Sequence, residues 1–173
     1  MIVQLGEGFG MRRILMLALT LAVSLTACGS SPTKASQSAQ QKELDTYRIE
    51  QIEVNWHKAS STKDLDLMMS LWADDATATL GGQTYTGKTE IRNFFATKAA
   101  PFQPQNNWVS DTPAYKIRVT VDGDKGTLYF ECHYVDVASH DVVAVVSADQ
   151  DVARINGQWL ITKLVSATPE LTP

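Results

Sequence analysis

From about residue 43 onward, apolar residues recur at the spacing of an α-helix. Steps of three and four residues predict a helix from about Glu43 to Ser61, since this spacing places the apolar side chains on one face. A second helix is predicted directly after it, with Thr62 or Asp64 capping its first turn. The two patterns consist of Ile49, Ile52, Trp56 and Ala59, followed by Leu65, Met68, Met69 and Trp72.

A glycine pair then interrupts the helical pattern. The stretch ATATLGGQTYTG predicts two short strands joined at Gly81 and Gly82, because two glycines supply the positive backbone angles of a tight hairpin. A third helix is predicted to begin after Gly87 and to end before Pro101. Its apolar face consists of Ile91, Phe94 and Phe95.

The second half of the chain has the pattern of long strands, with turns at DGDKG, ASHD and NG. Pro113 would break a ladder hydrogen bond, so it is predicted at an edge or a bulge. Helices followed by strands predict an α+β domain at about residues 43–168, in which three N-terminal helices cover a curved antiparallel sheet, with a short tail at 169–173. The predicted strands cover about 108–121, 126–137, 141–155 and 158–167.

The first 27 residues have the pattern of an export signal. The apolar run from Ile14 to Ala27 is shorter than the roughly 20 residues that cross a bilayer, and it follows Arg12 and Arg13. A charged segment, then an apolar run, then small residues is the order of a secretory signal peptide, with Met11 as an alternative start.

The end of this run, LTAC, resembles the bacterial lipobox. The resemblance implies that the Cys28 thiol carries a diacylglycerol, that the chain is cut before Cys28, and that the new amino terminus is acylated. Because Gly29 and not Asp follows, it further implies a cell-envelope protein anchored in the outer membrane and facing the periplasm. The alternative is a plain secretory signal with a coincidental cysteine. Residues 28–42 are predicted to be a flexible tether.

Composition and charge exclude several classes of protein. The net charge of −4 is mild and the 15 Lys and Arg residues are scattered, so no nucleic acid partner is expected. Two cysteines, Cys28 and Cys132, are too few for a disulfide framework or a zinc site, and neither a metal nor a cofactor is expected. Cys132 is predicted to be a buried free thiol.

Three segments together resemble the nuclear transport factor 2-like superfamily, in its ketosteroid isomerase and polyketide cyclase-like branch: KDLDLMMSLWADDATATL, YTGKTEIRNFF and VARINGQWLI. The resemblance implies a cone-shaped domain with a pocket between sheet and helices. The isomerase's phenol donor falls on Trp56, its general base on Leu80 and its second acid on Asp151. Because Leu80 cannot move a proton, ketosteroid isomerase activity is not expected.

The same resemblance places the face of Phe130 and Tyr134 toward the pocket. Asp151 in apolar surroundings would keep its proton and donate a hydrogen bond, whereas the alternative places Asp149 and Asp151 at a solvated strand end. The predicted ligand pocket consists of Trp56, Leu80, Phe130, Tyr134 and Asp151.

The histidines offer one further candidate. Glu131 and His133 share a strand face and could form an acid–base pair, by default at the surface, or in the cavity if a bulge shifts the register. His57 and His140 are predicted to be solvated. The strand at 141–155 begins apolar on both faces, which predicts that a second copy covers it in a homodimer.

Three functions stay open at this stage. The first is a membrane-anchored lipoprotein whose cone binds a small apolar ligand, which needs no catalytic group. The second is an enzyme of the cyclase, dehydratase or isomerase type that uses Asp151 or His133. The third is an adaptor in a cell-envelope complex, for which a filled core and an exposed apolar patch would be the evidence.

Overall fold

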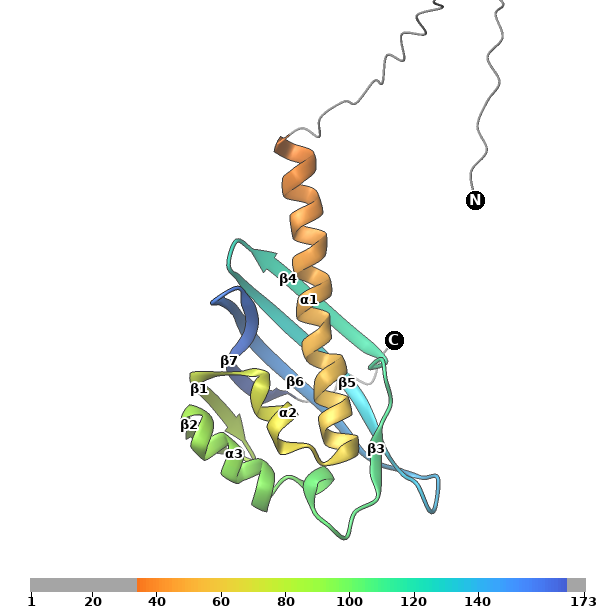
Figure 1. Cartoon of the computed structure of the whole chain (residues 1–173). Coiled ribbons are helices and arrows are strands. Elements are labelled where there is room, and N and C mark those ends of the chain that lie inside the picture. Colours follow the sequence, from red (N-terminus) through yellow and green to blue (C-terminus); the bar gives the residue numbers. More distant parts are fainter. Residues whose placement is uncertain (1–33, 168–173) are drawn as a thin grey trace, which may run out of the picture. The chain divides into compact units, whose positions relative to one another are not determined.

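Three helices lie against one face of a curved seven-stranded sheet, and the longest of them, α1 (Lys34–Thr62), crosses that face (Figure 1). The computed structural model describes residues 34–167, with side chains from 38 onward. The predicted signal peptide, Cys28 and the tail at 169–173 lie outside this range. None of the described helices is both long and apolar enough to cross a membrane. The predicted α+β class is confirmed.

The helices differ from their predicted bounds at two places. α1 begins at Lys34, so residues 34–42 are helical and do not form a flexible tether. α2 (Leu65–Ser70) is capped by Asp64, whose carboxylate accepts from the backbone N–H groups of Asp66 and Leu67, but it ends before Trp72. The remaining helices are α3 (Gly87–Thr97) and the 3-10 turn η1 (Ala100–Phe102).

The sheet is mixed, and this corrects the prediction of a purely antiparallel one. Its order is β2-β1-β7-β6-β5-β3, with β4 also paired to β5, and β1 runs parallel to β7. The predicted strand at 108–121 is divided in two around Pro113, which follows a cis peptide bond. The strands are β1 (Trp72–Leu80), β2 (Gln83–Thr86), β3 (Trp108–Ser110), β4 (Lys116–Asp122), β5 (Lys125–Asp136), β6 (Val142–Ile155) and β7 (Gln158–Ala167).

The core fills the space between α1 and the inner face of the sheet. Alternation along β5 places Leu128, Phe130, Cys132 and Tyr134 on this face, all of them buried. The hairpin between β1 and β2 turns at Gly81 and Gly82 with φ of 57° and 77°, as predicted.

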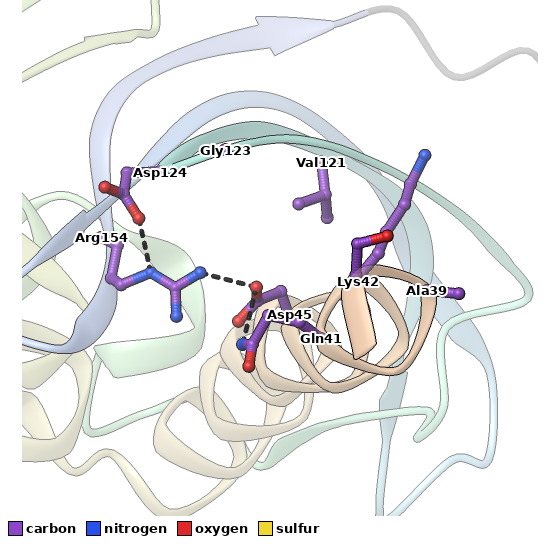
Figure 2. Close-up of a pocket in the computed structure, with 9 residues that line it drawn as sticks. Ala39, Gln41, Lys42, Asp45, Val121, Gly123, Asp124 and Arg154 are labelled. Atoms are coloured by element: carbon purple, nitrogen blue, oxygen red, sulfur yellow. Dashed lines mark hydrogen bonds and ion pairs between the residues drawn. The ribbon is translucent and has the colours of Figure 1, made fainter. Parts of the chain in front are cut away.

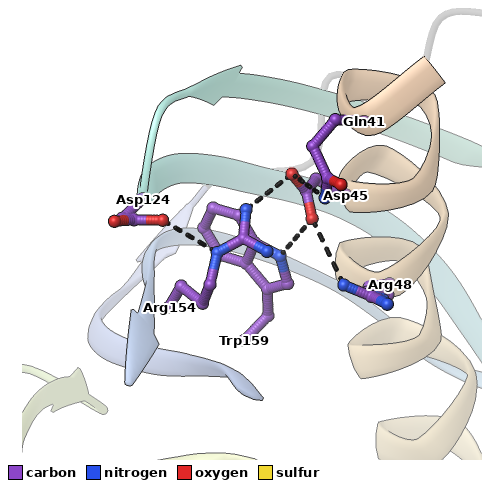
Figure 3. Close-up of polar contacts among 6 residues, drawn as sticks. All are labelled: Gln41, Asp45, Arg48, Asp124, Arg154 and Trp159. Atoms are coloured by element: carbon purple, nitrogen blue, oxygen red, sulfur yellow. Dashed lines mark hydrogen bonds and ion pairs between the residues drawn. The ribbon is translucent and has the colours of Figure 1, made fainter. Parts of the chain in front are cut away.

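A buried carboxylate ties the N-terminal half of α1 to the sheet. Arg154 on β6 lies between Asp124 and Asp45, with its Nη2 2.6 Å from Asp45 Oδ2 and its Nε 2.8 Å from Asp124 Oδ1 (Figure 2). Trp159 Nε1 and Gln41 Nε2 also donate to Asp45 (Figure 3). Burial by itself raises the pKa of Asp45, but the hydrogen bonds outweigh it and lower the pKa from 3.8 to about 2.

This contact makes the stability of the domain sensitive to acid. Because the folded pKa of Asp45 lies below the unfolded value, its contribution is fully present above about pH 4 and is lost as the pH falls toward 2. On the order of 2 kcal/mol should disappear over this interval. Urea unfolding at pH 7, 4 and 2.5 should therefore show a flatter pH dependence for Asp45→Asn than for the natural protein.

Asp124→Asn is the matched control, since Asp124 holds the same arginine from an exposed position. It should change the free energy of unfolding by no more than about 1 kcal/mol and leave the acid dependence in place. Parallel pH profiles for the natural protein and Asp45→Asn would contradict the assignment.

Candidate functional site

The inner face of α1 carries a buried carboxylate and a buried imidazole one turn apart. Glu53 and His57 are both 0% exposed, and His57 Nδ1 lies 2.8 Å from Glu53 Oε1. The same carboxylate oxygen accepts a 2.7 Å hydrogen bond from the backbone N–H of Ala114. The prediction that His57 is solvated is therefore wrong. The buried face of α1 is wider than its apolar stripe, because the segment before β4 covers it as well as the sheet.

An aromatic cluster adjoins this pair. The ring of Phe130, at the centre of the inner sheet face, meets the His57 ring edge to face at 5.3 Å and the Trp56 ring at 5.8 Å. Trp56 also contacts Phe95 at 5.4 Å and Trp72 at 6.0 Å. Phe130 thus links the His57 ring to the aromatic cluster, and Nε2 is the polar atom of that ring on the side away from Glu53.

Tyr134 forms the polar end of the same cluster. Burial raises the pKa of its phenol, and hydrogen bonds with Ser60 and Trp56 oppose that shift only in part. The phenol therefore stays neutral at physiological pH. It can donate or accept a hydrogen bond but does not act as a base.

Several polar atoms of this interior have no hydrogen-bond partner. Among the described residues, the buried side-chain nitrogen and oxygen atoms in this state include Glu53 Oε2, His57 Nε2, Trp72 Nε1 and both amide atoms of Gln150. Gln150 is 2% exposed and lies opposite Leu128 and Leu164, so its side chain is directed into the core. Native proteins pair nearly all such groups, so these atoms call for partners that the surrounding side chains do not supply.

The five residues predicted to line the pocket separate into three groups. Trp56, Phe130 and Tyr134 lie together in the interior, as predicted. Leu80 lies half-buried at the end of β1, packed at the edge of the core. Asp151 is exposed on the outer face, since it pairs with the outward-facing Thr127, so its predicted place beside Trp56 is wrong.

His133 and Glu131 lie on the outer face, and they do not pair with each other. His133 Nδ1 lies 3.1 Å from Asp111 Oδ2, and its ring stacks on Tyr115. Glu131 accepts hydrogen bonds from the hydroxyl groups of Tyr115 and Tyr129. The only bulge between β5 and β6 follows Tyr134, too late to turn His133 inward. The cavity alternative for His133 is therefore excluded.

Cys132 is a buried free thiol, as predicted. Burial raises its pKa to about 12, so it is protonated and unreactive while the domain is closed. Within the part of the chain that the structure describes, no group of three or more His, Cys, Asp or Glu residues could hold a metal ion.

A surface hollow of about 550 Å³ lies outside the cone, between the N-terminal half of α1 and the turn that joins β4 and β5 (Figure 2). Its charged lining includes Lys42, Asp45, Asp124 and Arg154. Arg154 pairs with both Asp45 and Asp124, so these charged groups already have partners within the groove. The groove therefore offers fewer unpaired polar groups than the interior.

Sequence reasoning missed Glu53, His57 and Gln150. The spacing of Glu53 and His57, four residues apart and next to Trp56, is the signal that could have found the first two, because it places them side by side on the helix. Gln150 gives no such signal. Its strand begins with apolar residues on both faces, so the alternation does not show which residues face inward.

The comparisons with known proteins agree with the fold. Residues 42–165 match the model of the SnoaL-like domain, and the chain belongs to this family. No curated protein matches the chain.

Solved structures show the same fold at low identity. A nuclear transport factor 2-like protein with a cystatin-like fold from Novosphingobium aromaticivorans superposes with a TM-score of 0.66 at 15% identity over 82% of this chain and 94% of its own. A proposed ketosteroid isomerase from Shewanella frigidimarina gives 0.55 at 14%, over 68% and 92%. A hexachlorocyclohexane dehydrochlorinase gives 0.57 at 19%, over 78% and 92%.

The unpaired amide of Gln150 should destabilise the ligand-free domain. Replacing it with Leu removes the desolvated amide and keeps the apolar packing, so Gln150→Leu should raise the free energy of unfolding by about 1–3 kcal/mol. Chemical denaturation of protein that has been unfolded, dialysed and refolded gives the measurement. The exposed Gln158→Leu is the control and should stay within about 0.5 kcal/mol. A destabilised Gln150→Leu would mean that the amide has partners in the folded domain.

Proposed function

We propose that the cone binds a small, largely apolar molecule in its interior. The observation that carries this proposal is the set of buried, unpartnered polar atoms on Glu53, His57, Trp72 and Gln150. His57 and Trp72 contact the aromatic cluster, and Gln150 lies opposite Leu128 and Leu164. A few polar atoms in an apolar and aromatic lining are typical of small-molecule sites. A ligand with one or two polar groups would pair with these atoms and remove the free-energy cost of burying them.

The chemistry of the lining limits the ligand. Gln150 offers a donor and an acceptor, Trp72 Nε1 offers a donor, and His57 Nε2 offers either, depending on its tautomer. No cationic side chain is among these unpartnered groups. The site therefore favours a neutral molecule, such as one that carries a carbonyl or hydroxyl group, over a phosphate or another strong anion.

A second candidate function is proton transfer. His57 has the Glu53 carboxylate 2.8 Å from its Nδ1, and its Nε2 has no hydrogen-bond partner. In such an arrangement the carboxylate orients the imidazole, and Nε2 can act as a general base. This pair replaces Asp151 and His133 as the acid–base candidate, since both of those lie on the outer face. The dehydrochlorinase named above shares this fold, and one fold can carry several chemistries.

Native mass spectrometry of the full chain, purified from the host under mild conditions, tests both candidates. The natural protein should carry a small molecule that is absent after unfolding and refolding. Gln150→Leu should lose it, and Gln158→Leu should keep it. His57→Gln retains a polar side chain, so for a binding protein it should hold the same molecule, whereas for an enzyme it should hold a different one, the unconverted substrate.

If the natural protein carries only water and Gln150→Leu is no more stable than the natural protein, the interior is a filled core and the proposal fails. In that case the adaptor alternative becomes the better one.

We also propose that the protein is anchored in the bacterial envelope through lipid on Cys28. The apolar run before Cys28 and the LTAC sequence support this proposal. Cys28→Ser should move the protein from the membrane fraction to the soluble fraction and lower the mass of the mature chain by the lipid. Cys132→Ser is the matched control and should stay in the membrane fraction. If the natural protein and Cys28→Ser divide in the same way between the membrane and soluble fractions, the proposed lipid anchor is contradicted.

The homodimer remains a proposal, supported by the outer face of the sheet. Val143 and Val165 are 40% and 39% exposed there, and Val145 on the same face is half-buried. A second copy that covers this face would bury the apolar start of β6.

A further inference from the structure

One lysine holds the segment that covers an end of the interior. Lys63, directly after α1, places its Nζ 2.7 Å from the carbonyl oxygen of Gln103 and 2.6 Å from that of Asn106. The carbonyl oxygen of Pro104 lies 3.4 Å away. A single ammonium group therefore gathers three carbonyl groups of one loop, which lies about 40 residues further along the chain.

The backbone of Lys63 is in an unusual conformation for this residue type. Its φ is 57°, in the left-handed region, where a helix commonly ends on glycine. A residue with a side chain costs free energy at such a position. The contacts made by the ammonium group offset that cost, and they depend on this conformation to direct the side chain toward the loop.

The loop closes over the aromatic cluster. The turn η1 lies between the C-terminal ends of α1 and α3 (Figure 1). Phe102 of η1 is 7% exposed and packs edge to face on Phe95 at 5.5 Å. Phe95 in turn contacts Trp56 and Trp72. Phe102 is thus separated from the proposed ligand site by a single aromatic layer.

Few other polar contacts fix this segment. Within 99–106 the hydrogen bonds are local, such as those from the amide of Asn106 to Ala100 and from that of Gln103 to Ala99. Apart from the bond of Ala99 to Phe94 at its start, the hydrogen bonds described between this segment and the rest of the domain all come from Lys63. Breaking them would free the segment without disturbing the sheet.

We infer that residues 100–106 form a movable cover over the interior and that Lys63 is the latch that holds it closed. This inference rests on the proposed function in one respect only, namely that a ligand enters and leaves through the opening. Lys63 is a positioning residue: it touches no ligand, and it sets how often the interior opens.

Hydrogen exchange of the full chain, followed by mass spectrometry, measures the opening without any ligand. Lys63→Met keeps the length of the side chain and removes its donors. This variant should speed exchange in peptides that cover residues 100–106 by about 10- to 100-fold, while peptides of strand β5 keep their natural rates. Lys58→Met is the control, because Lys58 is an exposed lysine on the same helix.

Labelling of Cys132 reports whether the opening reaches the interior. A small thiol reagent at fixed pH should modify Cys132 about 10-fold faster in Lys63→Met than in the natural protein or Lys58→Met. Lys63→Gly should also label quickly. It should melt at a higher temperature than Lys63→Met, because glycine tolerates the left-handed backbone. If Lys63→Gly labels quickly but is nearly as stable as the natural protein, the faster labelling comes from loss of the latch and not from general unfolding.

Three results would overturn the inference. Unchanged exchange at 100–106 in Lys63→Met would show that the lysine holds nothing. Exchange that rises equally in β5 would show a global effect. Faster exchange without faster labelling of Cys132 would show a loose loop that opens no path to the interior. None of these readouts needs a ligand, so the latch can stand even if the natural protein proves to carry no small molecule.

Discussion

The close packing of α1 along β5 is the constraint on which the interior depends. Gly126 contributes to it, since a Cβ atom there would lie only 3.1 Å from Ile49 Cδ1 on α1. The same Cβ atom would also collide with the carbonyl oxygen of Thr120 on the paired strand β4. Asp45 fixes the helix to β6 and β7 at one end, and Ser61, which accepts a 2.9 Å hydrogen bond from Ser110 N–H, fixes it to β3 at the other. With both ends held, the residues on the inner face of the helix between them are committed to the core. Glu53 and His57 are among them, although they are polar.

The helices and most of the strands could be predicted because their signals are local. The glycine pair, the cap at Asp64 and the alternation of β5 depend on near neighbours in sequence. Trp72 could not be assigned in the same way, because one apolar residue at helical spacing fits the end of α2 or the start of β1. The parallel pairing of β1 with β7 joins segments more than 80 residues apart, and no local pattern records it.

The site was predicted less well, for a physical reason. The faces of β6 alternate, but its first residues are apolar on both sides, so the sequence does not show which parity points inward. The family comparison directed Asp151 into the cone, whereas the register places Gln150 there. On α1, the helical spacing of apolar residues predicted a buried stripe that is narrower than the face the structure buries, and it therefore left out Glu53 and His57. Both errors involve polar residues in apolar surroundings, and such conflicts between local pattern and structure concentrate at functional sites.

The two faces of β5 show how such conflicts can be weighed. On the outer face, the buried carboxylate of Glu131 is bonded by two phenols and lies 3.7 Å from Lys116, so its burial is explained within the fold. On the inner side, Gln150 is equally buried but neither of its amide atoms has a hydrogen-bond partner, and Nε2 of the buried His57 has none either. Burial alone therefore does not distinguish structural polar groups from functional ones. Whether their hydrogen bonds are satisfied does distinguish them. An unpaired buried polar group lowers stability unless a molecule from outside the chain supplies its hydrogen-bond partner.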